Sequence, residues 1–387
     1  MKYFILALFF VGISIGLLLN SKPAEPIIPT QPIIEHQLET GTETPSQTSE
    51  QPLLLQTSEY STYVDPQGYF ELPLEGATGY ASIPINVRGL PSSESTLLCS
   101  VSAGTGFTII EEVGDWWQVK INGEQGYVYH DYCLLNLPDV LPSIIYQNTN
   151  STQAVFTSSY LPIPNISVEQ LYKAMAYNER LGREEYMMPV LYGTAKKIAI
   201  AQKSAKNEGN SLILYEAYRP YEVQVMIREE LRAINEINDQ IKVGISTSPW
   251  STNWFISAGI SNHQRGFAVD ISYATIIEME QFLVGEYLCE TVSKYDEAVM
   301  PTPIHELSAL SISMAYPVNS NNDVEWRTTP LSETMNHSAI KLREYCTEAG
   351  LTPLASEWWH FNDLDYYGKI KGTGDFFLTE VFSVAPC

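Results

Sequence analysis

The sequence predicts an α+β domain in the C-terminal half of the chain, preceded by a small all-β barrel. Short β-rich runs alternate with turn signals between residues 81 and 136, whereas the later part mixes amphipathic helical patterns with short β-rich runs. Because these later patterns do not alternate strictly, we expect a mixed or antiparallel sheet with flanking helices rather than a parallel α/β fold. A chain of 387 residues is long enough for both domains.

The N-terminal segment predicts export. Lys2 is followed by an apolar run from Tyr3 to Leu19, a length shared by signal peptides and membrane anchors. We therefore expect residues 1–20 to place the protein in the cell wall or medium, or to anchor it on the outer face of the cytoplasmic membrane. Residues 21–80 are rich in Pro, Thr, Ser, Gln and Glu, with almost no hydrophobic periodicity, and predict a disordered tether.

Charge and cysteine content narrow the possible partners and the redox state. A net charge of −23 repels phosphate backbones, so nucleic acid and a polybasic membrane patch are excluded. Five cysteines in an exported chain permit two disulfides and leave one over. The pairs that respect the domain boundary are Cys99 with Cys133 and Cys289 with Cys346. The connectivity stays open, because two pairs can be drawn from five cysteines in about fifteen ways.

The first domain, residues 81–136, is predicted from its hairpin pattern. Its β-rich runs are Phe107–Val113, Trp116–Ile121 and Gly126–Tyr129. Asn122-Gly123 between two alternating runs is a strong signal for a tight hairpin. The spacing suggests a small barrel of five or six strands.

This segment resembles a bacterial SH3-like domain. The resemblance rests on Ile85-Asn86-Val87-Arg88, Trp116-Trp117-Gln118-Val119 and Gly126-Tyr127-Val128. It implies binding to cell-wall peptides, while the alternative is a spacer with a Trp-filled core. The segment is itself acidic, so attraction to anionic wall polymers cannot be its mode of binding.

Residues 137–163, rich in Pro and Asn, are expected to be a linker to the last domain at 164–387. Amphipathic patterns predict helices over Val168–Leu181, Thr194–Glu208, Tyr221–Asn238 and Leu331–Ala349. β-rich runs predict strands over Ser211–Tyr215, Phe267–Tyr273 and Leu351–Ser356.

Histidines are scarce, which shortens the search for a metal site. The six are His36, His130, His263, His305, His337 and His360. His305-Glu306 begins an H-E-x-x-H pattern, but Ala309 stands where the second histidine is required, so that motif fails. His337 stands at the predicted start of a helix, where a cap or a surface role is expected.

His36 lies in the predicted tether and His130 in the predicted barrel. The last two histidines fall in two of three linked motifs. These are Tyr215-Glu216-Ala217-Tyr218-Arg219-Pro220, then Ser261-Asn262-His263-Gln264-Arg265-Gly266-Phe267-Ala268-Val269-Asp270, and Glu357-Trp358-Trp359-His360. Together they resemble the signature of the VanX-type D-Ala-D-Ala dipeptidases and the related zinc D,D-carboxypeptidases, S-x-H-x-x-G-x-A-x-D followed by E-x-W-H. The resemblance covers essentially all of residues 164–387. It implies one Zn²⁺ per chain, held by His263, Asp270 and His360.

Strand geometry agrees with that ligand set if two turns are present. Asp270 follows His263 by an odd interval, so on one unbroken strand they would face opposite sides. Gly266 supplies a turn between them. Glu357 and His360 can meet only across a tight or helical turn, where positions i and i+3 are neighbours. Two imidazoles and one carboxylate leave a fourth position open, which is the pattern of a catalytic zinc site.

The resemblance also implies roles for four other residues. Glu357 would be the general base that activates water and passes a proton to the leaving amine. Arg219 would stabilise the carbonyl oxygen as it gains charge, and Pro220 after it is expected to open a helix. Glu216 is a departure from the pattern, because the dipeptidases usually carry Asp three residues before the arginine. If this acid contacts the substrate's amino group, its longer side chain would shift or abolish the preference for a dipeptide. Ser261 either hydrogen-bonds substrate or caps its loop.

The implied activity is zinc-dependent hydrolysis of D-alanyl-D-alanine in cell-wall metabolism. A D,D-carboxypeptidase that trims stem peptides is the alternative within the same chemistry, favoured by export and a wall-binding domain. The alternative of another class is a non-catalytic wall-binding protein. The completeness of the ligands, base and arginine speaks against it.

Overall fold

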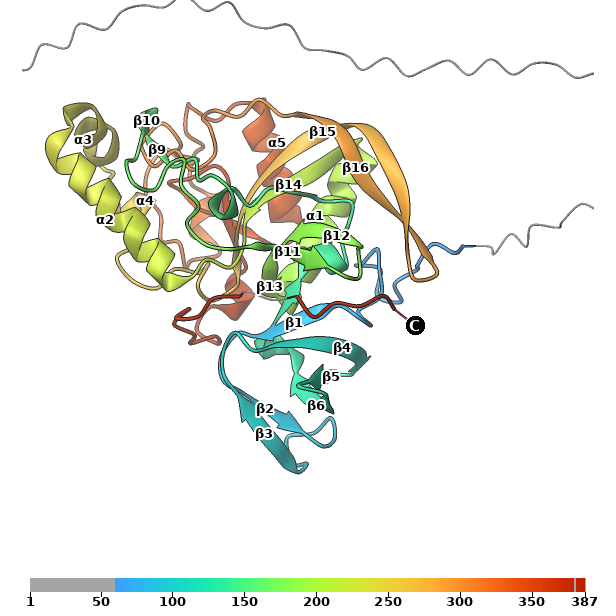
Figure 1. Cartoon of the computed structure of the whole chain (residues 1–387). Helices are drawn as coiled ribbons and strands as arrows, with labels where there is room; N and C mark the ends of the chain where they lie inside the picture. Colours follow the sequence, from blue (N-terminus) through green and yellow to red (C-terminus); the bar gives the residue numbers. More distant parts are fainter. Residues whose placement is uncertain (1–59, 379–380, 387) are drawn as a thin grey trace, which may run out of the picture. The chain divides into compact units, whose positions relative to one another are not determined.

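The computed structural model describes residues 60–378 and 381–386. The predicted signal or anchor at residues 1–20 lies outside the described residues, and so does most of the predicted tether. Among the described residues, no helix has both the length and the apolar character needed to cross a membrane. Figure 1 shows the arrangement of the described elements.

The first domain is all-β, as predicted (Figure 1). Its strands are β1 Thr78–Ala81, β2 Ile85–Arg88, β3 Leu97–Val101, β4 Gly106–Val113, β5 Trp116–Ile121, β6 Glu124–Tyr129 and β7 Cys133–Asn136. All neighbours pair antiparallel in the order β7-β1-β4-β5-β6-β2-β3. The expected hairpin turn is present, with positive φ at Asn122 and Gly123. Trp117 is fully buried in the core.

The sheet extends beyond residues 81–136 on both sides. Strand β1 begins inside the predicted tether, and Phe70 and Leu72 before it are buried. The tether prediction is therefore wrong for this last part, because apolar side chains there find a core. Strand β13, Pro189–Leu191, adds to β7, so the last domain contributes an edge strand to the same sheet.

The segment 137–163 is not an exposed linker. Leu137, Val140 and Ile144 are buried in the main core. Strand β8, Ile145–Tyr146, pairs parallel with β14 in the second sheet. The short strands β9, Thr157–Ser158, and β10, Leu161–Pro162, form a small hairpin. The linker prediction is wrong because the Pro and Asn content does not show that apolar residues of this segment reach the main core.

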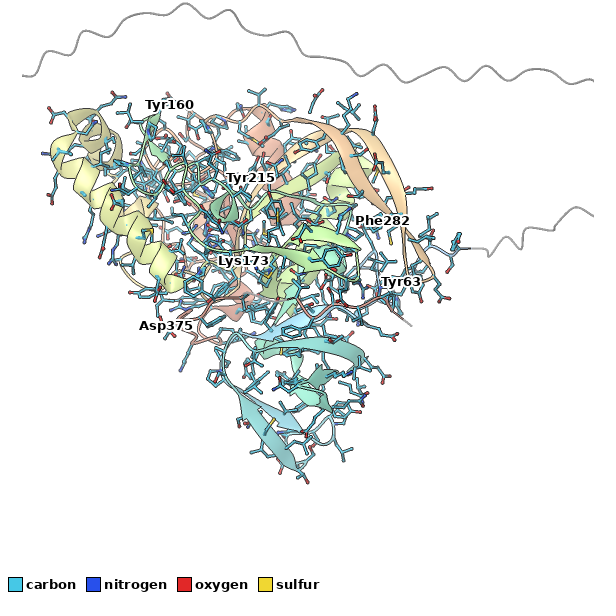
Figure 2. All side chains as sticks on the ribbon, viewed as in Figure 1. Tyr63, Tyr160, Lys173, Tyr215, Phe282 and Asp375 are labelled. Carbon is cyan, nitrogen blue, oxygen red and sulfur yellow. The ribbon has the colours of Figure 1, made fainter. Side chains whose placement is uncertain are left out.

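The second sheet has mixed strand directions, and the α+β prediction is confirmed. Its order is β17-β18-β15-β14-β8, with β16 also on β15. The strands are β14 Asn210–Glu216, β15 Ala268–Val284, β16 Tyr287–Glu297, β17 Thr352–Pro353 and β18 His360–Asn362. The long β15–β16 hairpin extends outward (Figure 1), and the sequence did not predict it. Its Phe282, labelled in Figure 2, packs under the guanidinium of Arg183.

Three of the four predicted helices are present. The helices are α1 Tyr192–Asn207, α2 Tyr221–Ile237, α3 Asp239–Ser246, α4 Thr252–Phe255 and α5 His337–Glu348. The helix predicted at Val168–Leu181 is wrong. Val168 has a φ of 64°, which a helix does not allow, and β11, Met175–Asn178, pairs with β12, Arg183–Tyr186. Helices α1 and α5 pack against each other beside the second sheet.

The four described cysteines are free, so the disulfide pairs considered for them are wrong. Cys99 lies on the outer edge strand β3 and Cys133 on β7, at opposite ends of the barrel strand order. Cys289 lies on β16 in the long hairpin and Cys346 lies on α5, and both are buried. Cys387 lies outside the described residues.

Candidate active site

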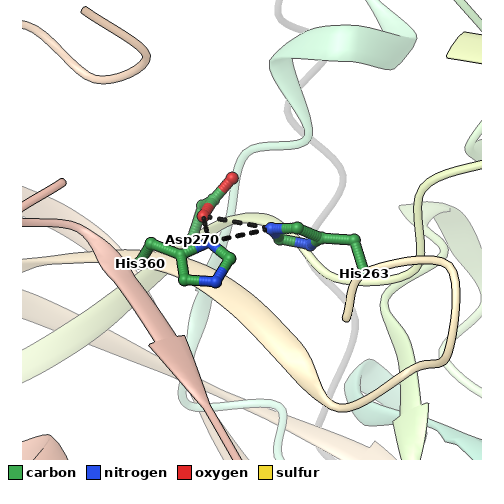
Figure 3. Close-up of side chains that lie close together, drawn as sticks. All are labelled: His263, Asp270 and His360. Carbon is green, nitrogen blue, oxygen red and sulfur yellow. Dashed lines mark hydrogen bonds and ion pairs between the residues drawn. The ribbon is translucent and has the colours of Figure 1, made fainter. Parts of the chain in front are cut away.

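Two strands and one loop bring the predicted metal ligands together. Asp270 on β15 stands directly opposite His360 on β18. His263 comes from the loop before β15, and Gly266 between them adopts a φ of 78°. That conformation favours glycine, and a Cβ at this position would meet the Leu134 side chain at 2.3 Å. The turn expected at Gly266 is therefore present, and Figure 3 shows the three side chains converging.

The three donor atoms form a compact triangle. His263 Nε2 lies 3.1 Å from His360 Nδ1 and 3.4 Å from Asp270 Oδ1. His360 Nδ1 lies 3.1 Å from Asp270 Oδ1. Ligands about 2.1 Å from a tetrahedral zinc ion lie roughly 3.4 Å from one another. These residues, all of them buried, therefore fit a zinc ion with little rearrangement.

Hydrogen bonds on the far side of each ring fix which nitrogen faces the triangle. His263 Nδ1 lies 2.7 Å from the carbonyl oxygen of Ala217, which can only accept, so Nδ1 carries the proton. His360 Nε2 lies 3.1 Å from Asn362 Oδ1, which also accepts from Asn262. Neutral rings held this way direct two nitrogen lone pairs and a carboxylate oxygen at one point. A cation can accept all three of these electron pairs. In metal sites, hydrogen bonds to the other ring nitrogen orient the histidine ligands in the same way.

Glu357 lies beside this triangle. The Trp358-Trp359 turn connects it to His360, as the spacing required, and places its Oε2 3.8 Å from His360 Nδ1. Burial raises the pKa of Glu357 to about 8, against the opposing effect of His360. A carboxyl group tuned toward neutral pH suits proton transfer in both directions.

Arg219 approaches Asp270 from the end of β14. Its Nε donates to Glu216 Oε2 at 2.6 Å, its Nη1 to Gln224 Oε1 at 2.6 Å, and its Nη2 to Asp270 Oδ2 at 3.3 Å. Nη2 also donates to Glu216. A register irregularity at the end of β14 turns the chain here, and Pro220 then precedes α2, as predicted. A guanidinium has five N–H donors, so one on Nη1 remains for a substrate.

Glu216 is placed away from the cavity. It is fully buried, and its Oε1 accepts from the Tyr172 hydroxyl at 3.1 Å and from Asn150 Nδ2. Its Oε2 is occupied by Arg219. Burial raises the pKa of Glu216, but the guanidinium of Arg219 outweighs burial and holds this pKa below its ordinary value. The prediction that Glu216 contacts the substrate's amino group is therefore replaced by a role in positioning Arg219.

Ser261 does line the cavity, but its polar groups are used within the loop. Its hydroxyl and its backbone N–H both donate to Gln264 Oε1 at 2.7 Å. Of the two roles that the sequence left open for Ser261, the structure supports the capping of its own loop.

The cavity reveals one residue that the motifs did not indicate. It has a volume of about 240 Å³, and its lining includes Arg219, Asp270, Glu357, His263 and His360. His305 also lines it, with Nε2 3.2 Å from Asp270 Oδ2. The failed H-E-x-x-H test removed His305 from consideration. The scarcity of histidines in the sequence was the signal that could have kept His305 among the candidate site residues.

Comparison with family models agrees with this architecture. Residues 84–133 match a model described as a bacterial SH3 domain, and residues 190–371 match one described as D-ala-D-ala dipeptidase. No curated protein matches the chain. The C-terminal domain is thus a peptidase. Residues 190–371 are similar to the D-ala-D-ala dipeptidase family, and they follow a segment that is similar to a bacterial SH3 domain, in the order that the sequence motifs predicted.

Proposed function

We propose that this protein is a zinc peptidase that hydrolyses the bond between two D-alanine residues in cell-wall peptides. The observation that carries the proposal is the convergence of two imidazole lone pairs and one carboxylate oxygen in a buried cavity. Zinc favours nitrogen and carboxylate donors in this number, and three protein ligands leave a position open for chemistry. The family match supplies the substrate class.

The chain's own residues supply the remaining chemistry. When bound, zinc lowers the pKa of a water molecule and polarises the substrate carbonyl. Glu357 accepts a proton as water attacks the carbonyl carbon, and then donates it to the nitrogen of the departing residue. The unpaired N–H of Arg219 stabilises the carbonyl oxygen as it gains charge, an effect of about 3 kcal/mol for a well-aimed donor.

We further propose that the protein acts outside the cytoplasm, held near its substrate by the SH3 domain. An apolar N-terminal segment and a bacterial SH3 domain support this location. Membrane anchoring through residues 1–20 is the alternative to a cleaved signal. Sedimentation of the full chain with purified peptidoglycan tests the binding, and an unchanged supernatant concentration would contradict it.

The hydrolytic role is tested with the full chain after metal removal and reloading. Release of D-alanine from D-Ala-D-Ala and from a pentapeptide stem should vanish on chelation and return with Zn²⁺. Glu357→Gln should retain the metal and lose hydrolysis, whereas Glu348→Gln, at an exposed position on α5, should match the unaltered protein. Hydrolysis at an undiminished rate in Glu357→Gln would show that another group is the base. A zinc-loaded protein that cleaved neither peptide would favour the non-catalytic alternative.

A further inference from the structure

The charges lining the cavity discriminate between a free dipeptide and the end of a longer peptide. A free dipeptide brings an ammonium group and a carboxylate, whereas an acylated one brings only the carboxylate. In the described part of the chain, the acids lining the cavity are Asp270 and Glu357, and the arginines are Arg219 and Arg265. The question is which of these four charges is available to a substrate.

Neither acid is available to an ammonium group. Asp270 Oδ1 faces the two histidine ligands, and Oδ2 accepts from Arg219 and His305. Glu357 is the base of the proposed reaction, and an ion pair with the substrate's ammonium would lower its basicity. Burying an ammonium without an anionic partner is strongly unfavourable. The cavity therefore disfavours a free amino terminus.

His305 offers a neutral acceptor close to the same place. Its Nε2 lies 3.2 Å from the carboxylate Oδ2 of Asp270, so Nε2 carries the proton and donates it. Its Nδ1 is then an acceptor, and this buried atom has no hydrogen-bond partner in the described part of the chain. The ring is 1% exposed and stacks on Phe156, which also lines the cavity. An amide N–H would satisfy Nδ1 without bringing a charge.

His305 adopts a strained backbone conformation at this position. The backbone of His305 has a φ of 59°, a left-handed conformation that is strained for a residue with a side chain. The next residue, Glu306, is fully buried and accepts hydrogen bonds from Thr157 and the Tyr160 backbone. These contacts fix the strained turn, and the turn places the imidazole against Asp270.

Arg265 is the charge that remains free. It lines the cavity two residues after His263, and it forms no ion pair with any described residue. Its Nε is buried without a hydrogen-bond partner, and Nη1 makes a single long contact of 3.5 Å to Asn262 Oδ1. A half-buried guanidinium with unused donors suits a carboxylate, which it can bind through two parallel hydrogen bonds.

We propose that the site takes peptides whose terminal carboxylate is free and whose amino group is acylated, as at the D-Ala-D-Ala end of a stem peptide. Arg265 binds the carboxylate, and His305 accepts the amide N–H on the other side of the cleaved bond. The proposal rests on the hydrolysis of the D-Ala-D-Ala bond proposed above. It selects the carboxypeptidase reaction over cleavage of the free dipeptide.

The test compares D-Ala-D-Ala with N-acetyl-D-Ala-D-Ala on the zinc-loaded full chain. The two differ only at the amino end, where acetylation replaces the ammonium by an uncharged amide and adds an acetyl group. We expect kcat/KM to be about tenfold to a hundredfold higher for the acetylated peptide. Equal or faster cleavage of the free dipeptide would overturn the proposal. If neither peptide were cleaved, the proposed hydrolysis would fail separately, and calorimetric binding of the same two peptides would still decide the preference.

Two variants test which residues cause the preference for the acetylated peptide. Arg265→Gln should raise KM for the acetylated peptide about tenfold, but not for its C-terminal amide, which lacks the carboxylate. Arg232→Gln, at an exposed position on α2, is the matched control. His305→Asp should shift the preference toward the free dipeptide by restoring an anionic partner for the ammonium. An unchanged preference in both variants would remove these residues from the proposal.

Discussion

Replacing Glu216 by Gln tests whether a residue outside the cavity governs the reaction. In the unaltered protein its carboxylate accepts hydrogen bonds from Nε and Nη2 of Arg219, and both side chains are buried, at 0% and 7% exposure. Gln keeps the size but removes the negative charge, so Arg219 retains only Asp270, at 3.3 Å, as an anionic partner. Breaking a buried ion pair from one side typically costs about 3–5 kcal/mol of unfolding free energy.

The same change should also alter catalysis. A guanidinium no longer held by two hydrogen bonds loses its aim at the carbonyl oxygen, and one misaimed donor reduces kcat about a hundredfold. KM should change little, since Glu216 does not line the cavity. Glu216→Asp, which keeps the charge, should recover part of both losses.

Denaturant unfolding of the zinc-loaded protein measures the stability term, and steady-state kinetics with the better substrate measures the catalytic term. Glu278→Gln is the matched control, because Glu278 pairs with Lys294 in an ion pair in which both side chains are about 60% exposed. That pair should contribute less than about 1 kcal/mol. A Glu216→Gln protein with unchanged stability and unchanged kcat would refute the positioning role.

Three other changes have defined outcomes. Asp270→Asn should weaken zinc binding by at least about a hundredfold in a chelator competition, since even outer partners of metal ligands contribute that much. Trp117→Ala should lower the unfolding free energy by about 3–5 kcal/mol, measured by denaturant, because Trp117 is fully buried in the barrel core. The third change concerns the ion pair of Lys197 with Asp363. Burial lowers the pKa of Lys197, but Asp363 outweighs burial and holds this pKa above its ordinary value. The pair should therefore stabilise the protein fully below pH ~10 and lose that contribution as pH rises through the folded pKa; Lys197→Met should abolish this alkaline loss.

The sequence predicted the parts of the fold that depend on local pattern. Helix α2 has strong amphipathic periodicity with Pro220 before it, and the Asn122-Gly123 hairpin follows from turn chemistry. The helix predicted at Val168–Leu181 failed because Val168 takes a left-handed conformation and Met175–Asn178 pairs with Arg183–Tyr186 as a β-hairpin. The segment 137–163 was misread for a related reason, since composition does not show which few apolar residues reach a core.

The residues of the site also fall into two groups, those that a local pattern predicts and those that it does not. The motif residues were found because their spacing within short segments is diagnostic. His305 and the true contacts of Glu216 were missed because they depend on contacts between distant segments. His305 reaches Asp270 across 35 positions in the chain, and Tyr172 reaches Glu216 across 44. No local pattern encodes such neighbours.

Strand register places two of the proposed metal ligands beside the residue that holds the arginine. Glu216 on β14 stands opposite Asp270 on β15, and Asp270 stands opposite His360 on β18, so three adjacent strands place these residues in one row. Asp270 faces the metal triangle with Oδ1 and Arg219 with Oδ2. A shift of one residue in either pairing would turn a member of the row to the other face of the sheet. A single carboxylate therefore contacts both the proposed metal site and Arg219, and loss of Asp270 should impair zinc binding and the placement of Arg219 at once.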